Sequence, residues 1–513
     1  MIFEDVVRSE QCDKRLGLQL TGDGRVPIRS LLSITHVCSK WRTAVLQRPT
    51  FWTRADDHNH EQLQAFTERS RGLPLSLCVS KTAATGLDTV DGLWPRLRRL
   101  DLRLSDQNCD AIDLLGILAP QLECLTVVLE GIDRLPDEAW QRFARYHFDA
   151  PCSQLKALAL SPAAFMRPPY HFPNLTHLYL SFNFTGRRVE LKALLSTLPM
   201  LEHLHLHALS KENSTVVPFD GVPVKLSRLR TLTCTQSHAQ RAFDLLELIE
   251  FPVETMVRLQ QLTCHRPANV SLPDIIASQE FWNSFSRLEV ASEYFDMHAV
   301  AEGPRSGLWI QGTYTSNSTP FGWLRWFTED FFLSLDMEKI EEIHTSAFYE
   351  DFAEEFVHSA RHLKTLRVVV SDQEDEDWMS SYRFFHIVAD FARAPWLELE
   401  ELESIYIDTW ACDGLATLDP GLFIELLENR SRAGFPIRRL HINLDTVRFD
   451  QEARNWFKKL LEPAREFVED FQIFEGRPLC KMEMSHRWQV DEAEAYWGLP
   501  SDQRPRYILP FTE

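Results

Sequence analysis

The chain has 513 residues, of which 44% are hydrophobic, and its formal net charge at pH 7 is −20. A hydrophobic fraction of this size is typical of a folded protein, so the composition does not predict disorder. The acidic excess argues against a general affinity for nucleic acid or for an anionic membrane, because both need clustered Lys and Arg. The sequence has no apolar stretch of about 18 residues, so we expect no transmembrane helix.

Neither the N-terminal sequence nor the cysteine pattern indicates a secreted protein. The start, Met1 to Asp5, lacks a basic segment followed by an apolar run and is not expected to be a signal peptide. The ten cysteines are scattered and form no C-x-x-C pair, which favours a reduced, intracellular protein of the cytoplasm or nucleus. We expect no cofactor.

The first helical pattern runs from Ser30 to Leu46. Ser30 is a plausible N-cap, and Pro49 closes the segment. Apolar residues recur at helical spacing, at Leu31, Ile34, Val37, Cys38, Trp41 and Val45. A shorter amphipathic fragment opens the chain, with Ile2, Phe3, Val6 and Val7. A short helix is then expected over Leu63 to Arg69, and a half-buried strand over Leu73 to Val79.

A leucine phrase recurs down the next part of the chain. It consists of an apolar residue, two variable residues, an apolar residue, one variable residue and an apolar residue. Its first leucines step by 25, 33, 20, 26, 28 and 30 residues, close to the period of about 20–29 residues of a leucine-rich repeat. The phrases are Leu97-Leu100-Leu102, Leu122-Leu125-Val127, Leu155-Leu158-Leu160, Leu175-Leu178-Leu180, Leu201-Leu204-Leu206, Leu229-Leu232-Cys234 and Leu259-Leu262-Cys264.

After about residue 285 the phrase becomes irregular. A loop-like insertion rich in Gly, Ser, Thr and Pro follows, from Gly303 to Gly322. A longer helix is expected over Glu452 to Phe471, and the Pro-rich tail, Pro500 to Glu513, is expected to be loosely held. The later phrases are Phe285-Leu288-Val290, Ile340-Ile343-Thr345, Leu363-Leu366-Val368, Leu402-Ile405-Ile407 and Ile437-Leu440-Ile442.

These patterns predict an α/β fold, a leucine-rich-repeat solenoid with a curved parallel sheet and helices on its convex side, preceded by a short all-helical segment. One repeat cannot bury its own apolar face, so stacked neighbours must supply a shared core. The expected divisions are a helical segment at 1–54, a linker and capping strand at 55–90, repeats at 91–300, a loop insertion at 301–322, and irregular repeats with a helical cap at 323–513.

The segment from Ser30 to Trp52, SLLSITHVCSKWRTAVLQRPTFW, resembles the second half of an F-box. The matching residues are Leu31-Leu32, Val37-Cys38, Trp41-Arg42 and Pro49-Thr50-Phe51-Trp52. With the segment from Phe66 to Leu77, the resemblance covers roughly the first 80 residues, and the repeats extend it to the F-box/leucine-rich-repeat type of fungal proteins. In such proteins the F-box docks on the Skp adaptor of a cullin-RING ubiquitin ligase of the SCF type, and the solenoid selects a protein substrate.

The resemblance implies a docking face formed by Ile2, Phe3, Val6, Leu31, Leu32, Ile34, Val37, Cys38 and Trp41. The usual F-box opens with a Leu-Pro pair and an acidic residue several positions before an Ile-Phe, whereas this chain begins at Ile2-Phe3. Either the gene model starts late or adaptor binding has been lost. The third interpretation is a plain helical cap that shields the first repeat.

Histidines gather on the face of the repeats that is expected to be concave. Side chains alternate along a strand, so positions 3, 5 and 7 of the phrase face away from the buried leucines. This places His177, Tyr179, His203, His205 and His207 in one partner-binding patch on neighbouring strands. We expect these side chains to be at least partly solvent-accessible. A zinc site is the weaker alternative, since no Cys or carboxylate lies in matching positions.

No catalytic motif is present: the sequence has no G-x-S-x-G, no phosphate loop and no H-E-x-x-H. The acidic run from Asp372 to Asp377 is interpreted as a solvated loop. The sequence therefore predicts a non-catalytic substrate-recognition subunit of an SCF-type ligase, which binds the Skp adaptor with its cullin and an unknown protein substrate. The alternative is a leucine-rich-repeat scaffold that binds a protein partner without any ligase.

Overall fold

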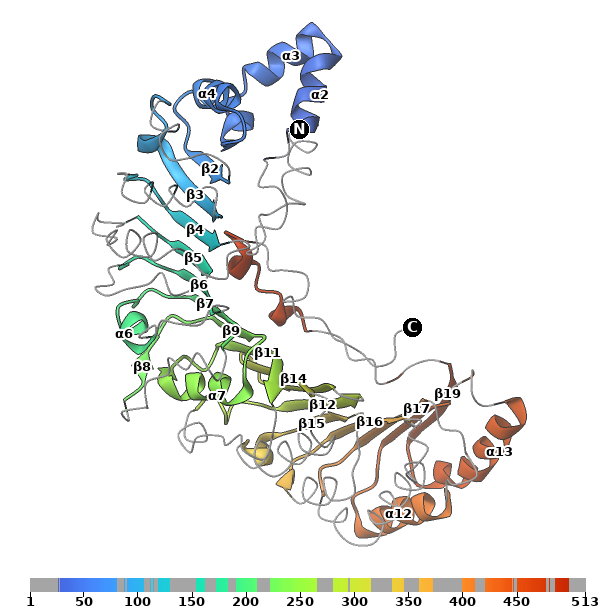
Figure 1. Ribbon diagram of the computed structural model, residues 1–513. Coiled ribbons are helices and arrows are strands. Elements are labelled where there is room, and N and C mark those ends of the chain that lie inside the picture. Colours follow the sequence, from blue (N-terminus) through green and yellow to red (C-terminus); the bar gives the residue numbers. More distant parts are fainter. Residues whose placement is uncertain are drawn as a thin grey trace. The chain divides into compact units, whose positions relative to one another are not determined.

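The protein is a mixed α/β molecule whose strands are mostly parallel (Figure 1). The chain divides into two compact units: Met1–Pro252 with Gln489–Pro505, and Val253–Trp488 with Arg506–Glu513. The computed structural model describes residues 26, 28–80, 87, 90–105, 111, 114, 119–129, 154–161, 172–182, 191–209, 222–264, 280–293, 296–314, 335–345, 359–371, 399–410, 420–444, 446, 450–476, 479 and 485–497. Within these ranges, no helix has the length and apolar content needed to cross a bilayer.

The first unit begins with two short helices, α2 (Arg29–Val37) and α3 (Ser39–Leu46), where the sequence predicts one. The prediction is wrong at Cys38, whose backbone is extended with φ −159° and ψ 170°. Arg42 Nε donates a hydrogen bond to the carbonyl oxygen of Thr35 at 3.0 Å. This bond satisfies a carbonyl in the last turn of α2 and helps the helix to end there.

The segment expected to be all-helical, residues 1–54, is followed directly by a strand that begins at its last residue. The 3₁₀ turn η1 (Pro49–Trp52) leads into β1 (Arg54–Asp56), which pairs in parallel with β2 (Leu75–Val79). Between them lies α4 (His60–Arg69), whose N-cap residue Asn59 accepts a hydrogen bond from a backbone N–H of the first turn. The expected helix and strand of this region are therefore present, but β1 was not predicted.

The following strands of the first unit pair in parallel and in sequence order. The leucine at the middle of each phrase is matched in register with the next, from Leu100 through Leu158 to Leu232. The predicted order is confirmed for these six strands. After the turn η3 (Trp94–Arg96), the strands are β3 (Leu97–Leu104), β4 (Cys124–Leu129), β5 (Ala157–Ser161), β6 (His177–Ser181), β7 (His203–His207) and β9 (Thr231–Thr235).

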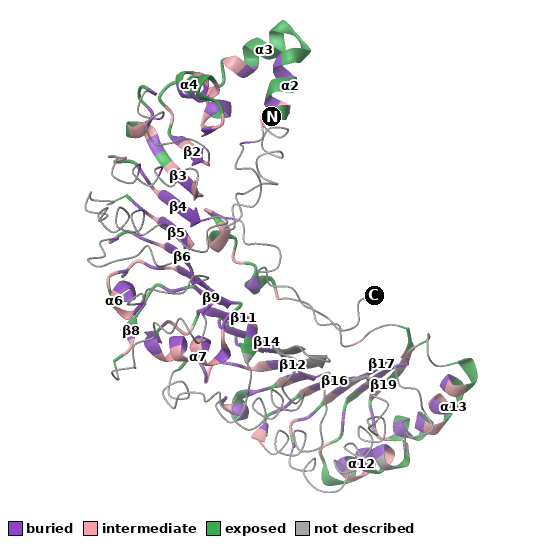
Figure 2. Ribbon diagram, in the orientation of Figure 1, coloured by how far each residue is buried: buried purple, intermediate pink, exposed green. Residues whose placement is uncertain are grey.

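The leucines of the phrases are buried and form the core behind these strands, and Figure 2 colours the strands largely as buried. Two helices pack there, α6 (Leu191–Ser196) and α7 (Ala239–Leu248), and both bury an apolar side. The short strands β8 (Val224–Lys225) and β10 (Ile249–Glu250) pair with each other in parallel. Each phrase thus places its leucines against those of its neighbours, which is how a repeated short unit acquires a core.

The second unit opens with a departure from parallel pairing. β12 (Arg287–Glu293), β13 (Asp296–Glu302) and β14 (Gly307–Tyr314) form an antiparallel meander, and β14 pairs in parallel with β11 (Met256–Cys264). The expected loop insertion over 301–322 is therefore wrong for β14. Glycine permits the tight turn before this strand, because a Cβ on Gly303 would lie 2.3 Å from the carbonyl oxygen of Ser284.

The later phrases form strands that pair in parallel in sequence order, beginning with β12 and β15. They are β15 (Glu342–Thr345), β16 (Thr365–Ser371), β17 (Ser404–Trp410), β18 (Arg439–Leu444) and β19 (Asp470–Glu475). The remaining elements are η9 (Met337–Lys339), α12 (Pro420–Ala433), α13 (Gln451–Leu461), η12 (Glu462–Glu466), η13 (His486–Trp488) and, in the first unit, η14 (Asp491–Glu494).

The helix expected over Glu452 to Phe471 is too long. It ends at Leu461, because Pro463 lacks the backbone N–H that would continue the helical hydrogen bonds. The chain then forms β19, which was not predicted. Several expected features lie outside the described residues: Ile2, Phe3 and Val6, the acidic run Asp372 to Asp377, and the tail Pro500 to Glu513.

Truncation of a phrase leucine should destabilise the first unit. Leu178 is only 1% exposed between its neighbouring strands, so Leu178→Ala should lower the free energy of unfolding by about 2–5 kcal/mol. Leu32→Ala, at a 43% exposed position, should change it by less than about 0.5 kcal/mol. Urea unfolding followed by circular dichroism measures both, and equal effects would contradict the assigned core.

Candidate recognition surface

The strands of the first unit present a polar face opposite the leucine core. We call it the front face and define it by two register rows. The first row is Arg99, Cys124, Ala157, His177, His203 and Thr231. The second row is Asp101, Thr126, Ala159, Tyr179, His205 and Thr233. Because side chains alternate along a strand, both rows lie on the same side of the sheet.

The histidines predicted for this face come together in the expected register. His177 pairs with His203, and Tyr179 pairs with His205. The ring centroids of the first pair lie 4.5 Å apart and those of the second pair 4.8 Å apart. The predicted juxtaposition of these side chains on adjacent strands is therefore correct.

The expectation that these rings are solvent-accessible is wrong. His177, His203, His205 and His207 are all buried. Threonine hydroxyls of β9 lie against three of the rings. His203 Nδ1 lies 2.9 Å from Thr231 Oγ1. His205 Nε2 and His207 Nδ1 lie 3.1 Å and 3.0 Å from Thr235 Oγ1.

Burial also changes the charge expected of the patch. It lowers the pKa of His203 to about 3, with further lowering from His177 and Arg230. The pKa of His177 is lowered as well, chiefly by burial. The His203 ring is therefore neutral in the folded protein at pH 6, and burial disfavours the charged form of His177 as well.

A C-terminal stretch of the first unit, Gln489–Trp497, covers part of this face; we call it the tail segment. His177 Nε2 lies 2.8 Å from the carbonyl oxygen of Glu492. A carbonyl only accepts, so Nε2 carries the hydrogen. Arg99 Nη1 donates to the carbonyl oxygen of Tyr496, while its guanidinium also pairs with Asp101. Two side chains of the first row thus hold the backbone of the tail segment.

The tail segment ends in a buried tryptophan. Trp497 is 3% exposed and packs in a socket formed by Cys124, Ala157, Ala159 and Tyr179. Its indole Nε1 donates a hydrogen bond of 2.8 Å to Thr126 Oγ1. The two alanines leave room for the indole ring, and the threonine satisfies its only polar atom. Sequence analysis missed this residue, although Tyr496-Trp497 is the aromatic pair of an otherwise polar, acidic stretch.

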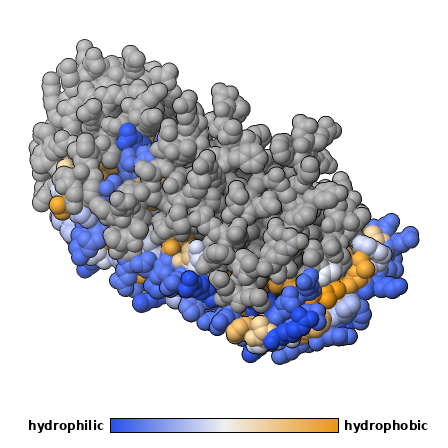
Figure 3. Space-filling view, turned by 90° about the horizontal axis from the view of Figure 1, so that it is seen from below, coloured by the Kyte–Doolittle hydropathy of each residue, from blue (hydrophilic) through white to orange (hydrophobic). Residues whose placement is uncertain are grey.

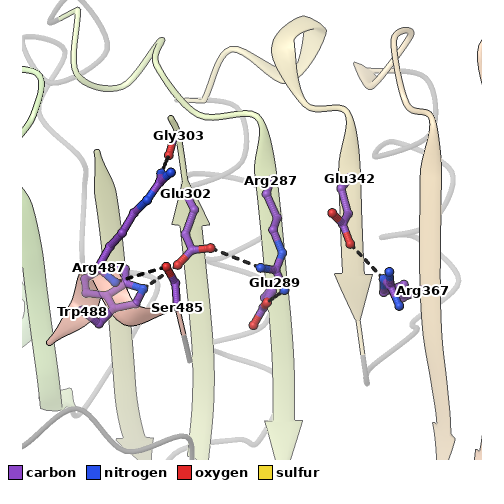
Figure 4. A network of polar contacts seen from close by, with 9 residues as sticks. All are labelled: Arg287, Glu289, Glu302, Gly303, Glu342, Arg367, Ser485, Arg487 and Trp488. Carbon is purple, nitrogen blue, oxygen red and sulfur yellow. Dashed lines mark hydrogen bonds and ion pairs between the residues drawn. The ribbon is translucent and has the colours of Figure 1, made fainter. Parts of the chain in front are cut away.

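The second unit holds another buried tryptophan on its own polar strand face (Figure 4). Trp488 packs against Met256, Val300 and Trp309 and donates from Nε1 to Glu302 Oε1 at 2.6 Å. A Cβ at position 307 would lie 2.8 Å from the indole, so Gly307 provides the space for it. Glycine is needed here for close approach, not for its backbone conformation.

Ion pairs extend along the strands around Trp488. Arg287 bridges Glu302, at 3.3 Å, and Glu289. Farther along, Arg367 pairs with Glu342 at 2.8 Å (Figure 4). In the view of Figure 3, hydrophilic residues dominate the described surface and hydrophobic residues occur in separate patches.

In the second unit, side chains of two strands bind both the backbone N–H and the backbone carbonyl of Leu479. The N–H of Leu479 donates to both carboxylate oxygens of Asp408 at 3.0 Å. Arg367 Nη1 donates to the carbonyl oxygen of the same residue at 3.2 Å. Asp408 and Arg367, on adjacent strands, therefore bind Leu479 through its main chain, independently of its side chain.

The predicted docking residues near the N-terminus separate into two groups. Leu32, Val37 and Trp41 are 43%, 58% and 40% exposed, and Cys38 is exposed as well. Leu31 and Ile34 are buried and therefore cannot form part of an accessible docking face in this structure. Trp41 is thus far more exposed than core leucines such as Leu178.

Among the described residues, no cluster of three or more His, Cys, Asp or Glu side chains could hold a metal ion. The comparisons with known proteins give no family: no family model matches the chain, and no curated protein is similar to it. The interpretation of the two surfaces therefore depends on their residues alone.

Acidification should destabilise the first unit through its buried histidines. The folded-state pKa of His203, about 3, lies below the unfolded value of about 6.5. The unfolded chain therefore binds the proton first as the pH falls, and stability is lost below about pH 6.5. Between pH 6.5 and 5 this ring should cost about 2 kcal/mol.

His203→Gln should reduce the difference in unfolding free energy measured in urea at pH 7 and pH 5. His36→Gln removes an exposed imidazole from α2 of the same unit and should leave that difference in place. A His203→Gln variant with an unchanged pH dependence would show that this ring is not buried in the neutral form.

Proposed function

We propose that this protein is a non-catalytic substrate-recognition subunit of an SCF-type cullin-RING ubiquitin ligase. The α2–α3 helices would bind the Skp adaptor, and the strand faces would bind a protein target. The observation that carries the proposal is the exposure of Leu32, Val37 and Trp41 on two adjoining helices. These residues belong to the segment that resembles an F-box.

Exposed apolar side chains on adjoining elements favour a docking role. Isolated exposed leucines are common, but adjacent large apolar groups that include a tryptophan are typical of protein-binding surfaces. Tryptophan is also among the residues that most often dominate binding energy when a partner buries it. Trp41 is therefore the residue of this surface on which adaptor binding should depend most.

The second part of the proposal is a leucine-rich-repeat solenoid as the target-binding body. It is supported by the matched leucines of successive parallel strands in the first unit and by the parallel strands β15 to β19 in the second. Stacked repeats of this kind present long strand faces, which suit recognition of extended protein segments.

The alternative is a leucine-rich-repeat scaffold that binds protein without a ligase. The burial of Leu31 and Ile34 favours it, because these side chains pack into the chain's own core instead of the proposed docking face. The α2–α3 helices would then serve as a cap for the first strands. The two functions differ in one measurable property, which is binding to the Skp adaptor.

Replacement of Trp41 should abolish adaptor binding without unfolding the protein. In a pull-down with purified Skp adaptor, Trp41→Ala should lose at least ten-fold in bound protein, because it removes the tryptophan among the exposed residues proposed to dock. Its melting temperature should stay close to that of the unchanged chain, since Trp41 is 40% exposed.

Trp456→Ala provides the matched control. Trp456 is an exposed tryptophan on α13, 45% exposed, in the second unit. This variant should bind the adaptor as the unchanged chain does. If the unchanged chain fails to bind, the scaffold function is favoured. A large loss of stability in Trp41→Ala would instead assign Trp41 to the core of a cap.

A further inference from the structure

The front face of the first unit holds the tail segment in a way that does not depend on most of its side chains. His177 and Arg99 both donate to backbone carbonyl oxygens, those of Glu492 and Tyr496. The carbonyl of Glu492 belongs to the 3₁₀ turn η14, so a different sequence that forms such a turn would offer the same acceptor. Main-chain contacts of this kind give affinity with little dependence on sequence, and a pocket for one side chain adds specificity.

The side-chain contribution comes chiefly from Trp497, with a smaller share from the partly buried Tyr496, whose ring centroid lies 4.9 Å from that of His177. From Gln489 to Tyr496, no residue of the tail segment is buried, whereas Trp497 is almost completely so. Its socket is formed by the small side chains of Cys124, Ala157 and Ala159, beside the larger ring of Tyr179. A segment that is attached mainly at one anchor can open locally without unfolding the strands beneath it.

Charge adds a second preference. Asp491, Glu492 and Glu494 make the tail segment acidic. Arg230 Nη2 lies 3.9 Å from Glu492 Oε1, and both side chains are largely exposed. Such a pair contributes little to stability on its own, but it selects for negative charge at that position. The chain's own segment thus shows which peptide chemistry fits the face.

We infer that the front face of the first unit is a binding groove for a short acidic protein segment that forms a 3₁₀ turn before a tryptophan anchor, and that the tail segment, with η14, is its intramolecular occupant. A target segment carrying an acidic residue five positions before the tryptophan, as Glu492 stands before Trp497, displaces the tail segment. This inference rests on the target-recognition part of the proposed function and is independent of adaptor docking.

A free peptide must compete with the covalently attached tail segment for the groove, and this competition determines how tightly the peptide is expected to bind. A covalently linked occupant acts at an effective concentration that is typically about millimolar for a flexible connection. A free peptide therefore cannot occupy the groove of the unchanged chain at micromolar concentration. Removal of the anchor from the tether should expose the socket and allow the free peptide to bind.

The test uses the full chain and a fluorescein-labelled peptide with the sequence of residues 489–500. Trp497→Ala in the full chain should bind this peptide at least ten-fold more tightly than the unchanged chain in a fluorescence-anisotropy titration. A peptide with alanine in place of its tryptophan should not bind. Trp41→Ala and Trp456→Ala should behave as the unchanged chain, which separates failure of the groove from failure of adaptor docking.

A second variant places the binding in the socket. Ala159→Leu, added to Trp497→Ala, puts a larger side chain where the indole lies. This double variant should no longer bind the peptide, while its circular dichroism spectrum should remain that of a folded protein. Equal binding by the unchanged chain and Trp497→Ala would overturn the proposal. So would binding that survives Ala159→Leu.

Should Trp497→Ala not fold, Trp497→Leu retains an apolar anchor of smaller size. The proposal then requires this folded variant to bind the free peptide more tightly than the unchanged chain does. Absence of any gain in a folded Trp497→Leu variant would contradict a replaceable occupant.

Discussion

The structure depends on the shared burial of leucines between successive parallel strands. Leu100, Leu158 and Leu232 lie in one register line and are at most 2% exposed. A single phrase has no second layer of its own against which to pack, so each strand gains its core only when its neighbours are in place. A shift of one residue would turn every leucine towards the opposite face, which fixes the register strongly.

That register determines the chemistry of the opposite face. Because the leucines are fixed behind the sheet, the alternate positions must lie in front, and they bring the small side chains of Ala157 and Ala159 into one socket beside Tyr179. The same constraint brings the histidines together. In the second unit, Asp408 and Arg367 lie on adjacent strands and hold the main chain of Leu479. Both units thus use strand side chains to hold the main chain of residues far away in the sequence.

The sequence was informative where structure follows local periodicity. The leucine spacing predicted the order and parallel pairing of six strands, and the alternation of side chains predicted the pairing of His177 with His203. Prediction from the sequence failed for contacts between residues far apart in the chain, and where the backbone changes direction without a Gly, Pro or capping residue to indicate it. Trp497 lies 371 residues from Thr126, its hydrogen-bond partner, and no periodic pattern links them. For the same reason, the burial of the histidines could not be predicted. The break at Cys38 is another such failure, since its neighbours continue the helical spacing.

The most direct measurement is a double-mutant cycle between Trp497 and Thr126. Trp497→Phe keeps an aromatic ring but removes the indole N–H, and Thr126→Val removes the hydroxyl that accepts it at 2.8 Å. If the tail segment occupies the socket in solution, the urea unfolding free energies of the two variants should show a coupling of about 1 kcal/mol. Effects that add within about 0.3 kcal/mol would contradict the contact, and with it the account of a front face occupied by the chain's own segment.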